Sequence, residues 1–292
     1  MTTLRNRMVP YLLTAPAALC IAAFVLLPLL LVIGLAFFHI DLIGGATTWA
    51  GFANFATELA SDEFGRSVLN TLAYAAMTIP TSLAAGLVVA LLINGLTRGH
   101  GFWRSVYFLP VATTLVAMSA VWRWMFQANT GVVDLVLGPL GVHDWLSSPS
   151  LALPAIAIVG NWHQIGLVAI LYLAALSGLP TDPYESARLD GAKAWSRFWH
   201  VTWPALGPTT VFAFIATASS ALQAYDTIAA MTQGGPLDAT QTLTFAIWTR
   251  GVHYFDIGRA AVLSIALLAL SLVVTALQRT GYAKRLEKGA TR

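Results

Sequence analysis

Six long apolar runs restrict the fold of this chain more than any other feature of its sequence. Hydrophobic residues make up 57% of the 292 residues and charged residues only 10%, against about 25% charged residues in a typical soluble domain. Each run has the roughly 20 residues that a helix needs to cross a bilayer, so a soluble fold is excluded. The sequence predicts an all-α, polytopic membrane protein with six transmembrane helices in a single domain, residues 1–292. The predicted spans are about 12–38, 68–93, 105–126, 151–176, 208–230 and 258–278.

Basic residues indicate how these spans are oriented, because cytoplasmic loops of membrane proteins carry an excess of Lys and Arg. If the N-terminus is inside, twelve of the sixteen Lys and Arg residues also lie inside. We therefore predict a multi-pass membrane protein with both termini in the cytoplasm. The excess of basic residues, which gives a net charge of +3, is explained by this topology and does not indicate nucleic-acid binding. The basic residues placed outside are Arg66, Arg123, Arg250 and Arg259.

The stretch between the fourth and fifth apolar runs is polar and amphipathic, and its residue order predicts two short helices. Asp182 can cap a helix whose first position is Pro183, and Glu185, three residues after the cap, completes a capping box. Gly191 can adopt the left-handed conformation that ends this helix. The second helix presents aromatic side chains at three- and four-residue steps and stops at Pro204. These aromatic residues are Trp195, Phe198, Trp199 and Trp203.

The same stretch resembles the cytoplasmic loop of ABC importer permeases. The pattern of that loop runs Glu-Ala-Ala, has a glycine four residues after the last alanine, and ends Ile-x-Leu-Pro. Here residues 185–204 read ESARLDGAKAWSRFWHVTWP, with Ser186 in place of the middle alanine and Trp203 in place of the leucine. The resemblance implies that the hairpin 181–208 couples a cytoplasmic ATPase to transport. The coupling residues that it implies are Glu185, Ser186, Ala187, Asp190, Gly191, Lys193, Trp195, Phe198 and Pro204.

The resemblance covers nearly the whole chain and is to the carbohydrate type of permease, which includes maltose and glycerol-3-phosphate permeases. It implies the type I ABC importer permease (MetI-like) fold and a location in the plasma (inner) membrane of a prokaryote. The matching motifs outside the hairpin include Tyr11-Leu12-Leu13, Gly51-Phe52, Asn70-Thr71, Phe108-Leu109-Pro110, Trp122-Arg123-Trp124, Trp145-Leu146 and Gly234-Gly235-Pro236.

Import by alternating access is the mechanism that the resemblance implies. An extracytoplasmic binding protein would deliver a carbohydrate-class solute: a sugar, an oligosaccharide, or a glycerol phosphate or phosphodiester. A second, homologous permease subunit and two ATP-binding-cassette ATPase subunits would complete the complex in the lipid bilayer, with ATP and Mg on the ATPases. The chain itself would then not be an enzyme, and it contains no G-x-x-x-x-G-K-[ST] phosphate loop. Its six histidines form no H-E-x-x-H pair, so the sequence does not support a metal site.

Polar residues within the fourth and fifth spans are the candidates for the solute path. Three of them lie about ten residues from the start of the fourth span, near the bilayer midplane. The other three lie toward the outer half of the fifth span. An ionisable residue at membrane depth is a functional candidate, although hydrogen bonding between helices or anchoring at the interface also explains such residues. The six candidates are Asn161, His163, Gln164, Gln223, Tyr225 and Asp226.

Two features predicted near the outer face each allow two interpretations. Arg123, close to the external end of the third span, can anchor that helix by extending to the interface, or it can attract an anionic solute. Gly234-Gly235-Pro236 predicts a tight external turn, and the resemblance implies that this loop faces the binding protein.

A different class of function stays open from the sequence alone. A secondary transporter or channel that works without ATPases would need an ionisable relay within the membrane, and Asp226 and His163 could form it. The two hypotheses differ in whether transport depends on the hairpin.

Overall fold

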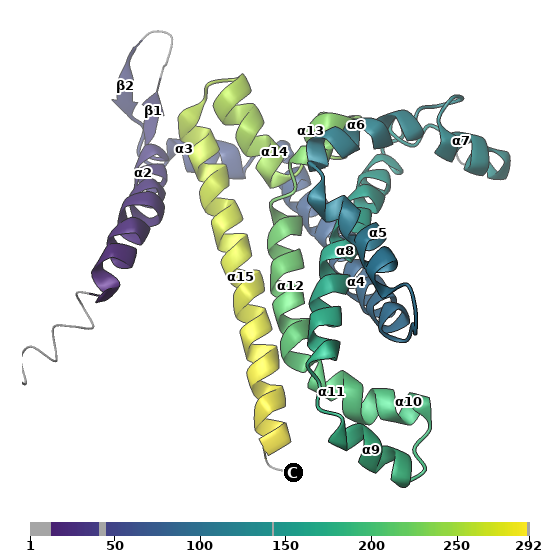
Figure 1. The fold of residues 1–292 in the computed structure, drawn as a ribbon. Coiled ribbons are helices and arrows are strands. Elements are labelled where there is room, and N and C mark those ends of the chain that lie inside the picture. Colours follow the sequence, from purple (N-terminus) through teal and green to yellow (C-terminus); the bar gives the residue numbers. More distant parts are fainter. Residues whose placement is uncertain (1–12, 41–44, 142, 291–292) are drawn as a thin grey trace, which may run out of the picture. The chain divides into compact units, whose positions relative to one another are not determined.

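The computed structural model of the chain describes residues 13–40, 45–141 and 143–290, with side chains described up to residue 277 except at 140. This part of the chain is mainly helical (Figure 1), which confirms the predicted all-α class. Within it, the two strands β1 (Phe38–Ile40) and β2 (Thr47–Trp49) pair antiparallel and were not predicted. The chain divides into two compact units, unit 1 (residues 1–64 and 246–268) and unit 2 (residues 65–245 and 269–292). The single-domain organisation stays a prediction.

Four helices of the described residues are long and apolar enough to cross a membrane without interruption. The number reaches the six that were predicted if each of two bent helix pairs is counted as one span, His100–Ala112 with Leu115–Met125 and Ala194–Ala205 with Gly207–Leu222. α4 begins at Asp62, earlier than predicted. Asp62 and Glu63 form its first turn, where acidic side chains interact favourably with the helix dipole. The uninterrupted helices are Leu13–Leu35, which contains η1 (Ala22–Leu26) and α2 (Leu27–Leu35), α4 (Asp62–Asn94), α8 (Ala152–Ser177) and Ile257–Leu277 within α15 (Ile257–Ala290).

The third predicted span is not one helix. α5 (His100–Ala112) and α6 (Leu115–Met125) meet at 97°, so the prediction of a continuous helix here is wrong. Thr113 and Thr114 between them are extended, and the Thr113 hydroxyl donates to the Pro110 carbonyl at 2.9 Å. This bond satisfies one of the carbonyls that the end of a helix leaves free, which stabilises the break.

The fifth predicted span ends early. A break separates α12 (Gly207–Leu222) from the short helix α13 (Asp226–Met231), so the prediction of one helix over 208–230 is wrong in its outer part. The Thr244 hydroxyl donates to the freed Leu222 carbonyl at 3.2 Å. A second threonine, Thr242, donates to the carbonyl of Ala224 at 2.9 Å. Breaks at membrane depth persist where such partners replace the lost helical bonds.

The helices of unit 2 pack closely around α8, which contacts α5, α12 and α13. A Cβ on Gly160 of α8 would collide with the Tyr74 hydroxyl of α4, so the close approach of these two helices requires glycine. The Thr71 hydroxyl of α4 accepts a hydrogen bond from the Leu243 amide at 2.9 Å, where α14 (Leu243–Trp248) begins. The buried cluster between the helices comprises Ala90, Val168, Tyr172, Leu206 and Ala213.

The segment between α6 and α8 contains two short helices, α7 (Val132–Leu137) and η2 (Gly138–Leu140). It turns back against the end of α6. The approach is so close that a Cβ on Gly131 would collide with the backbone of Met125 and Gln127. Near the start of α7, the buried Asp134 carboxylate accepts a hydrogen bond from the Asn129 amide at 2.8 Å.

Unit 1 joins the end of the first helix to the start of α15 through α3 (Ala53–Leu59). The Asn54 side chain donates from Nδ2 to the carbonyls of Ala36 and Phe38, both at 2.9 Å. A Cβ on Gly258 would collide with the Phe38 carbonyl and the Asn54 amide. The apolar part of the unit comprises Ala36, Ala261 and Val262, surrounded by Val32, Leu35, Phe37, Phe55 and Ile265.

A charged cluster completes unit 1. The Glu58 side chain, only 1% exposed, lies between Arg259 Nε at 2.5 Å and Arg250 Nε at 3.5 Å. Arg250, in the π-helical η4 (Thr249–His253), also pairs with Glu63. Asp256 accepts a hydrogen bond from the Arg259 amide at 3.2 Å in the first turn of α15. Opposite charges on both sides of Glu58 meet the condition under which a buried carboxylate is tolerated.

Candidate functional site

The first helix of the predicted hairpin is α9 (Asp182–Leu189), which starts one residue earlier than expected. Thr181 takes the position before the helix, and its carbonyl accepts hydrogen bonds from the amides of Tyr184 and Glu185 at 2.9 and 3.1 Å. No side chain caps this end, so the predicted capping box of Asp182 and Glu185 is wrong. Once Asp182 lies inside the helix, it is no longer in the capping position. Glu185 instead lines a cavity of about 380 Å³ together with Arg188.

The turn at Gly191 has the predicted left-handed conformation, with a φ of +73°. The Gly191 amide donates to the Arg188 carbonyl at 3.0 Å and the Ala192 amide donates to the Ala187 carbonyl at 2.9 Å. These bonds close the end of α9 as in other glycine-terminated helices. The prediction that two short helices meet at a glycine is therefore confirmed.

The second helix of the hairpin runs Ala194–Ala205 and meets α12 at 65°. It consists of α10 (Ala194–Arg197), a π-helical turn η3 (Phe198–Thr202) and α11 (Trp203–Ala205). Pro204 lies within α11, so the prediction that the helix stops at this proline is wrong. The helix ends at Ala205, one residue beyond this proline, and α12 begins at Gly207. The Tyr184 hydroxyl donates to the Thr202 hydroxyl at 3.0 Å and thereby joins the two helices of the hairpin.

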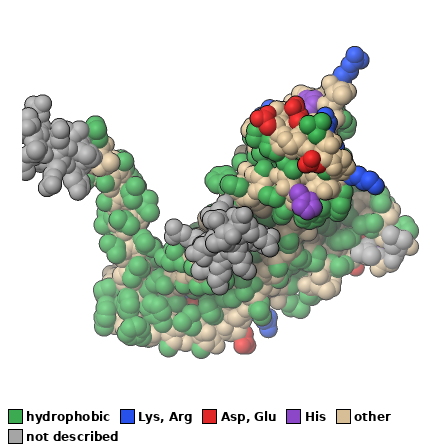
Figure 2. All heavy atoms as spheres, turned by 90° about the horizontal axis from the view of Figure 1, so that it is seen from below, with side chains coloured by type: hydrophobic (Ala, Val, Ile, Leu, Met, Phe, Trp, Pro, Cys, Tyr) green, Lys and Arg blue, Asp and Glu red, His purple; other side chains and the backbone are tan. Residues whose placement is uncertain are grey.

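The aromatic residues of the hairpin form the predicted common face. Trp199 is in ring contact with Trp195 at 5.7 Å, with Phe198 at 5.2 Å and with Trp203 at 6.0 Å between centroids. Trp195 is 72% exposed. Figure 2 shows charged and histidine side chains gathered over the hairpin, while apolar side chains cover most of the remaining visible surface. Among the predicted coupling residues, Ala187 and Phe198 are half-buried, and the exposed ones are Glu185, Ser186, Asp190, Gly191, Lys193, Trp195 and Pro204.

Five of the six residues predicted for the solute path line one cavity of about 280 Å³, which we call the inner cavity. Its walls come from α4, α6, α8 and the break between α12 and α13. The amide oxygen of Gln164 is buried there and has no hydrogen-bond partner among the described residues, as expected of a group that binds a ligand or water. The five residues are His163, Gln164, Gln223, Tyr225 and Asp226.

Asn161, the sixth candidate, does not line the inner cavity. Its amide oxygen accepts hydrogen bonds from the hydroxyls of Thr81 at 2.7 Å and Ser82 at 2.8 Å on α4. This geometry favours a role in joining α8 to α4. Sequence reasoning missed Tyr74 and Thr78, which also line the inner cavity. Their four-residue spacing places them on one face of α4, and this spacing of polar residues within an apolar run was the available signal.

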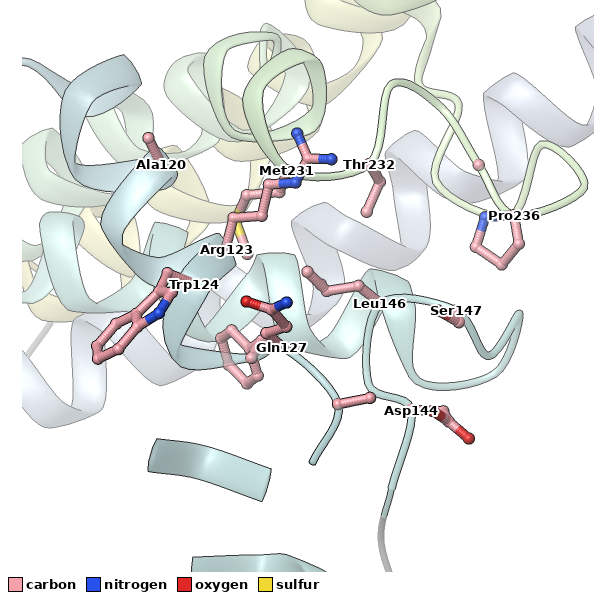
Figure 3. A pocket seen from close by; sticks show the side chains of 13 residues that line it. Ala120, Arg123, Trp124, Gln127, Asp144, Leu146, Ser147, Met231, Thr232 and Pro236 are labelled. Atoms are coloured by element: carbon pink, nitrogen blue, oxygen red, sulfur yellow. The ribbon is translucent and has the colours of Figure 1, made fainter. Parts of the chain in front are cut away.

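A second, larger cavity lies where α6 and α13 end, and we call it the outer cavity (Figure 3). Its volume is about 830 Å³. Arg123, whose two predicted roles both stay open, is among its lining residues, and its Nη1 donates to the Ala230 carbonyl at 3.4 Å. Trp122 faces inward and packs edge-to-face on Trp162 at 5.7 Å. The lining includes Ala120, Arg123 and Trp124 of α6, Phe126 to Ala128, Asp144, Leu146, Ser147, Met231, Thr232, Gly235 and Pro236.

The predicted external turn also contributes to the outer cavity. Gly234 has a φ of +85°, and a Cβ there would meet the Phe245 ring, which confirms the need for glycine at a tight turn. The Thr240 hydroxyl lies 2.7 Å from the Thr232 hydroxyl and donates to the Gly235 carbonyl at 2.8 Å. These bonds link the two ends of the loop.

Comparison with known proteins gives consistent matches over nearly the full length. Residues 46–281 match the family described as "Binding-protein-dependent transport system inner membrane component". The sn-glycerol-3-phosphate transport system permease protein UgpA of Agrobacterium fabrum is 28% identical over 286 residues, 97% of this chain and 98% of the relative. The sulfoquinovosyl glycerol transport system permease protein SmoG of the same organism is 33% identical over 276 residues, 94% of this chain and 90% of the relative.

A solved structure supports the fold. The chain is similar to a bacterial ABC transporter involved in the import of the acidic polysaccharide alginate, with a TM-score of 0.80, 21% identity and coverage of 97% of this chain and 98% of the other. The predicted fold is therefore confirmed.

Proposed function

The chain belongs to the family of binding-protein-dependent transport system inner membrane components, and we propose that it lines the path of a carbohydrate-class solute in such an importer. It is accordingly a multi-pass, inner-membrane permease subunit and not the catalytic subunit. The names of two relatives support the solute class, since one is a permease for sn-glycerol-3-phosphate and the other for sulfoquinovosyl glycerol. Both solutes combine hydroxyl groups with an anionic group.

The observation that carries the solute path is the gathering of polar residues around the inner cavity. His163 and Gln164 come from α8, and Gln223 and Tyr225 come from the break after α12. Amide, imidazole and phenol groups can both donate to and accept from hydroxyl groups, which is the chemistry that a sugar or polyol requires. A few convergent polar groups in a concave site are typical of small-molecule binding.

The assembly that we propose contains a second, homologous permease, two ABC ATPases that bind ATP and Mg, and an extracytoplasmic binding protein. Family membership supports the binding protein. The exposed aromatic face of the hairpin supports an ATPase contact, because Trp195 and Leu189 are 72% and 90% exposed and contiguous apolar surface marks interaction sites. A secondary transporter that works without ATPases loses its support, since the family is defined by dependence on a binding protein.

The orientation that we propose places both termini and the hairpin in the cytoplasm, and Gly234-Gly235-Pro236 outside, facing the binding protein. The excess of basic residues in the predicted internal segments supports it. Several of these residues, including Arg5, Arg7 and Arg292, lie outside the described residues. A reporter fused after Gly235 should be external and one fused after Arg197 cytoplasmic, and the reverse labelling would contradict the orientation.

The function is tested by uptake into proteoliposomes that contain the chain and the subunits that co-purify with it. We expect uptake of labelled carbohydrate-class solute to require both the binding protein and ATP. Replacing Gln223 by alanine should reduce uptake about two- to tenfold, the loss expected for one hydrogen bond, while the complex still assembles. Replacing Ser177, which lies on α8 away from the inner cavity, serves as the control. Uptake that needs neither ATP nor a binding protein would refute the proposal.

A further inference from the structure

We propose that the outer cavity binds the anionic group of the solute, with Arg123 as the charged ligand. This inference rests on the proposed function, because it assigns a second subsite to the same solute. The outer cavity, at about 830 Å³, falls within the range of about 300 to 1,000 Å³ that is typical of small-molecule sites. Arg123 is the one basic residue among those that line it.

The outer and inner cavities share two walls. α6 lines the inner cavity with its first residue, Leu115, and the outer cavity with Arg123 in its last turn. α13 likewise lines the inner cavity with Asp226 and the outer cavity with Met231. The two helices pack against each other. Because α13 has six residues, its ends are only about 9 Å apart. The inner cavity at one end of this helix and the outer cavity at its other end are therefore close neighbours.

The charges of the two cavities differ. Asp226 lines the inner cavity, and no Lys or Arg is among its lining residues. The outer cavity has the Arg123 guanidinium, and Figure 3 shows this side chain extending toward the end of α13 near Thr232, with the Asp144 carboxylate turned away from it. A guanidinium binds phosphate, carboxylate or sulfonate through two parallel hydrogen bonds. The anionic end of a solute is therefore favoured in the outer cavity.

Arg123 is positioned to offer several donors. The bond of its Nη1 to the Ala230 carbonyl, at 3.4 Å, uses one of the five N–H groups of a guanidinium. Nearby, Gln127, Ser147 and Thr232 supply an amide and two hydroxyls that can bind solute hydroxyl groups.

The walls of the outer cavity are fixed by ring contacts and hydroxyl bonds. Phe126, only 2% exposed, stacks on Trp122 at 5.8 Å and contacts Trp145 at 5.6 Å. On the opposite side, the bonded hydroxyls of Thr232 and Thr240 hold the external loop. A preformed site loses less conformational entropy when it binds a ligand.

The test uses sn-glycerol 3-phosphate as the anionic probe and glycerol as its neutral counterpart. Each probe is titrated onto the purified, complete transporter in nanodiscs, without binding protein and without ATP. We expect the wild type to bind the anionic probe at least about tenfold more tightly than glycerol, and Arg123→Gln to lose about tenfold in affinity for it. Arg123→Lys should retain part of the affinity, since it keeps the charge but not the planar fork.

Arg66→Gln is the matched control, because Arg66 is also basic and exposed but does not line the outer cavity. Its Nη1 lies 3.9 Å from Oδ2 of Asp238. Equal affinities of Arg123→Gln and Arg66→Gln, or equal binding of the two probes by the wild type, would overturn the proposal. A phospholipid that native mass spectrometry detects on the wild type but not on Arg123→Gln, and that the probe does not displace, would also overturn it in favour of a lipid anchor. Because the titration needs neither uptake nor ATP, its failure is distinguishable from failure of the proposed function.

Discussion

The two units hold distant segments together with different chemistry. In unit 1 one tie is charged: Glu58 of α3 is buried between Arg250 and Arg259, which follow it by about two hundred residues in the sequence. In unit 2 the ties that α8 makes are neutral. The Asn161 amide accepts from two hydroxyls of α4, and the Tyr172 hydroxyl donates to Thr210 of α12 at 3.1 Å.

The position of each tie in the sequence explains the difference. Glu58, Arg250 and Arg259 lie outside the long apolar runs or at their edge, whereas Asn161 and Tyr172 lie within α8. A charge is far more expensive than a neutral polar group where water is excluded, so segments in the membrane are joined by amides and hydroxyls. The comparison teaches that removing one partner of a buried charged tie is costly because the other charge is left unpaired, whereas the loss of a neutral tie costs less.

Replacing Glu58 by glutamine should have the largest effect. It removes the carboxylate between two buried or half-buried arginines, and breaking a buried ion pair by removing one partner destabilises by about 3 to 5 kcal/mol. Thermal unfolding of the purified protein measures the loss. Asp62→Asn, at an exposed position a few residues away, should lose no more than about 1 kcal/mol. Equal unfolding midpoints for the two variants would show that the charged tie has no special weight.

Changing Gly191 to valine should have the next largest effect, through the backbone and not through a tie. A β-branched residue at a φ of +73° is strained by about 1 to 3 kcal/mol, and the angle of the hairpin would change. We expect solute-stimulated ATP hydrolysis to be lost while the chain still inserts. Ser186→Ala, on the same exposed surface, should leave it unaffected. Normal stimulation in the valine variant would exclude the hairpin as the coupling element.

Asn161→Ala should destabilise the packing of α4 on α8 by about 1 to 2 kcal/mol, because it removes the bonds from Thr81 and Ser82 and the longer bond to the Met77 carbonyl at 3.4 Å. Proteolysis or thermal unfolding of the assembled complex would show the change. Gln223→Ala, at a residue that lines the inner cavity, should affect uptake and not stability. If Asn161→Ala instead reduced uptake at unchanged stability, the path role of this residue would be supported over the packing role.

The smallest effect is expected from Tyr184→Phe, which removes only the hydroxyl that joins the two hairpin helices. Tyr172→Phe is its matched control, because Tyr172 makes a similar bond to a threonine within the membrane spans. Each change should reduce stability by about 0.5 to 1.5 kcal/mol. Only Tyr184→Phe should also lower the ratio of transported solute to hydrolysed ATP. An equal ratio in both variants would show that this bond does not transmit movement.

The sequence reveals where the spans lie because apolar composition is a local property. It does not reveal the break in the fifth span, because the partners that stabilise the break after Leu222 are Thr242 and Thr244, some twenty residues later. The capping of α9 was misjudged by one residue for a similar reason. Asp182 and Thr181 are both good caps by type, and the choice between them depends on the backbone path from α8.

The inner cavity was largely predictable, since polar side chains in apolar helices must face a partner or water. The outer cavity was not, because it exists only where the bent third span meets the end of α13. The sequence predicts that Arg123 lies near the outer surface. Its place beside Thr232 required the bend at Thr113 and Thr114.

A single helix, α8, carries the His163 and Gln164 side chains of the inner cavity. It ends at Ser177, a few residues before the hairpin helix α9 begins at Asp182. The angular phase between the cavity and the hairpin is therefore set by the number of residues between Gln164 and Ser177. Inserting one residue there would rotate everything beyond it by about 100°. A substitution along this stretch leaves that phase unchanged, whereas an insertion or deletion would turn the hairpin away from whatever it contacts.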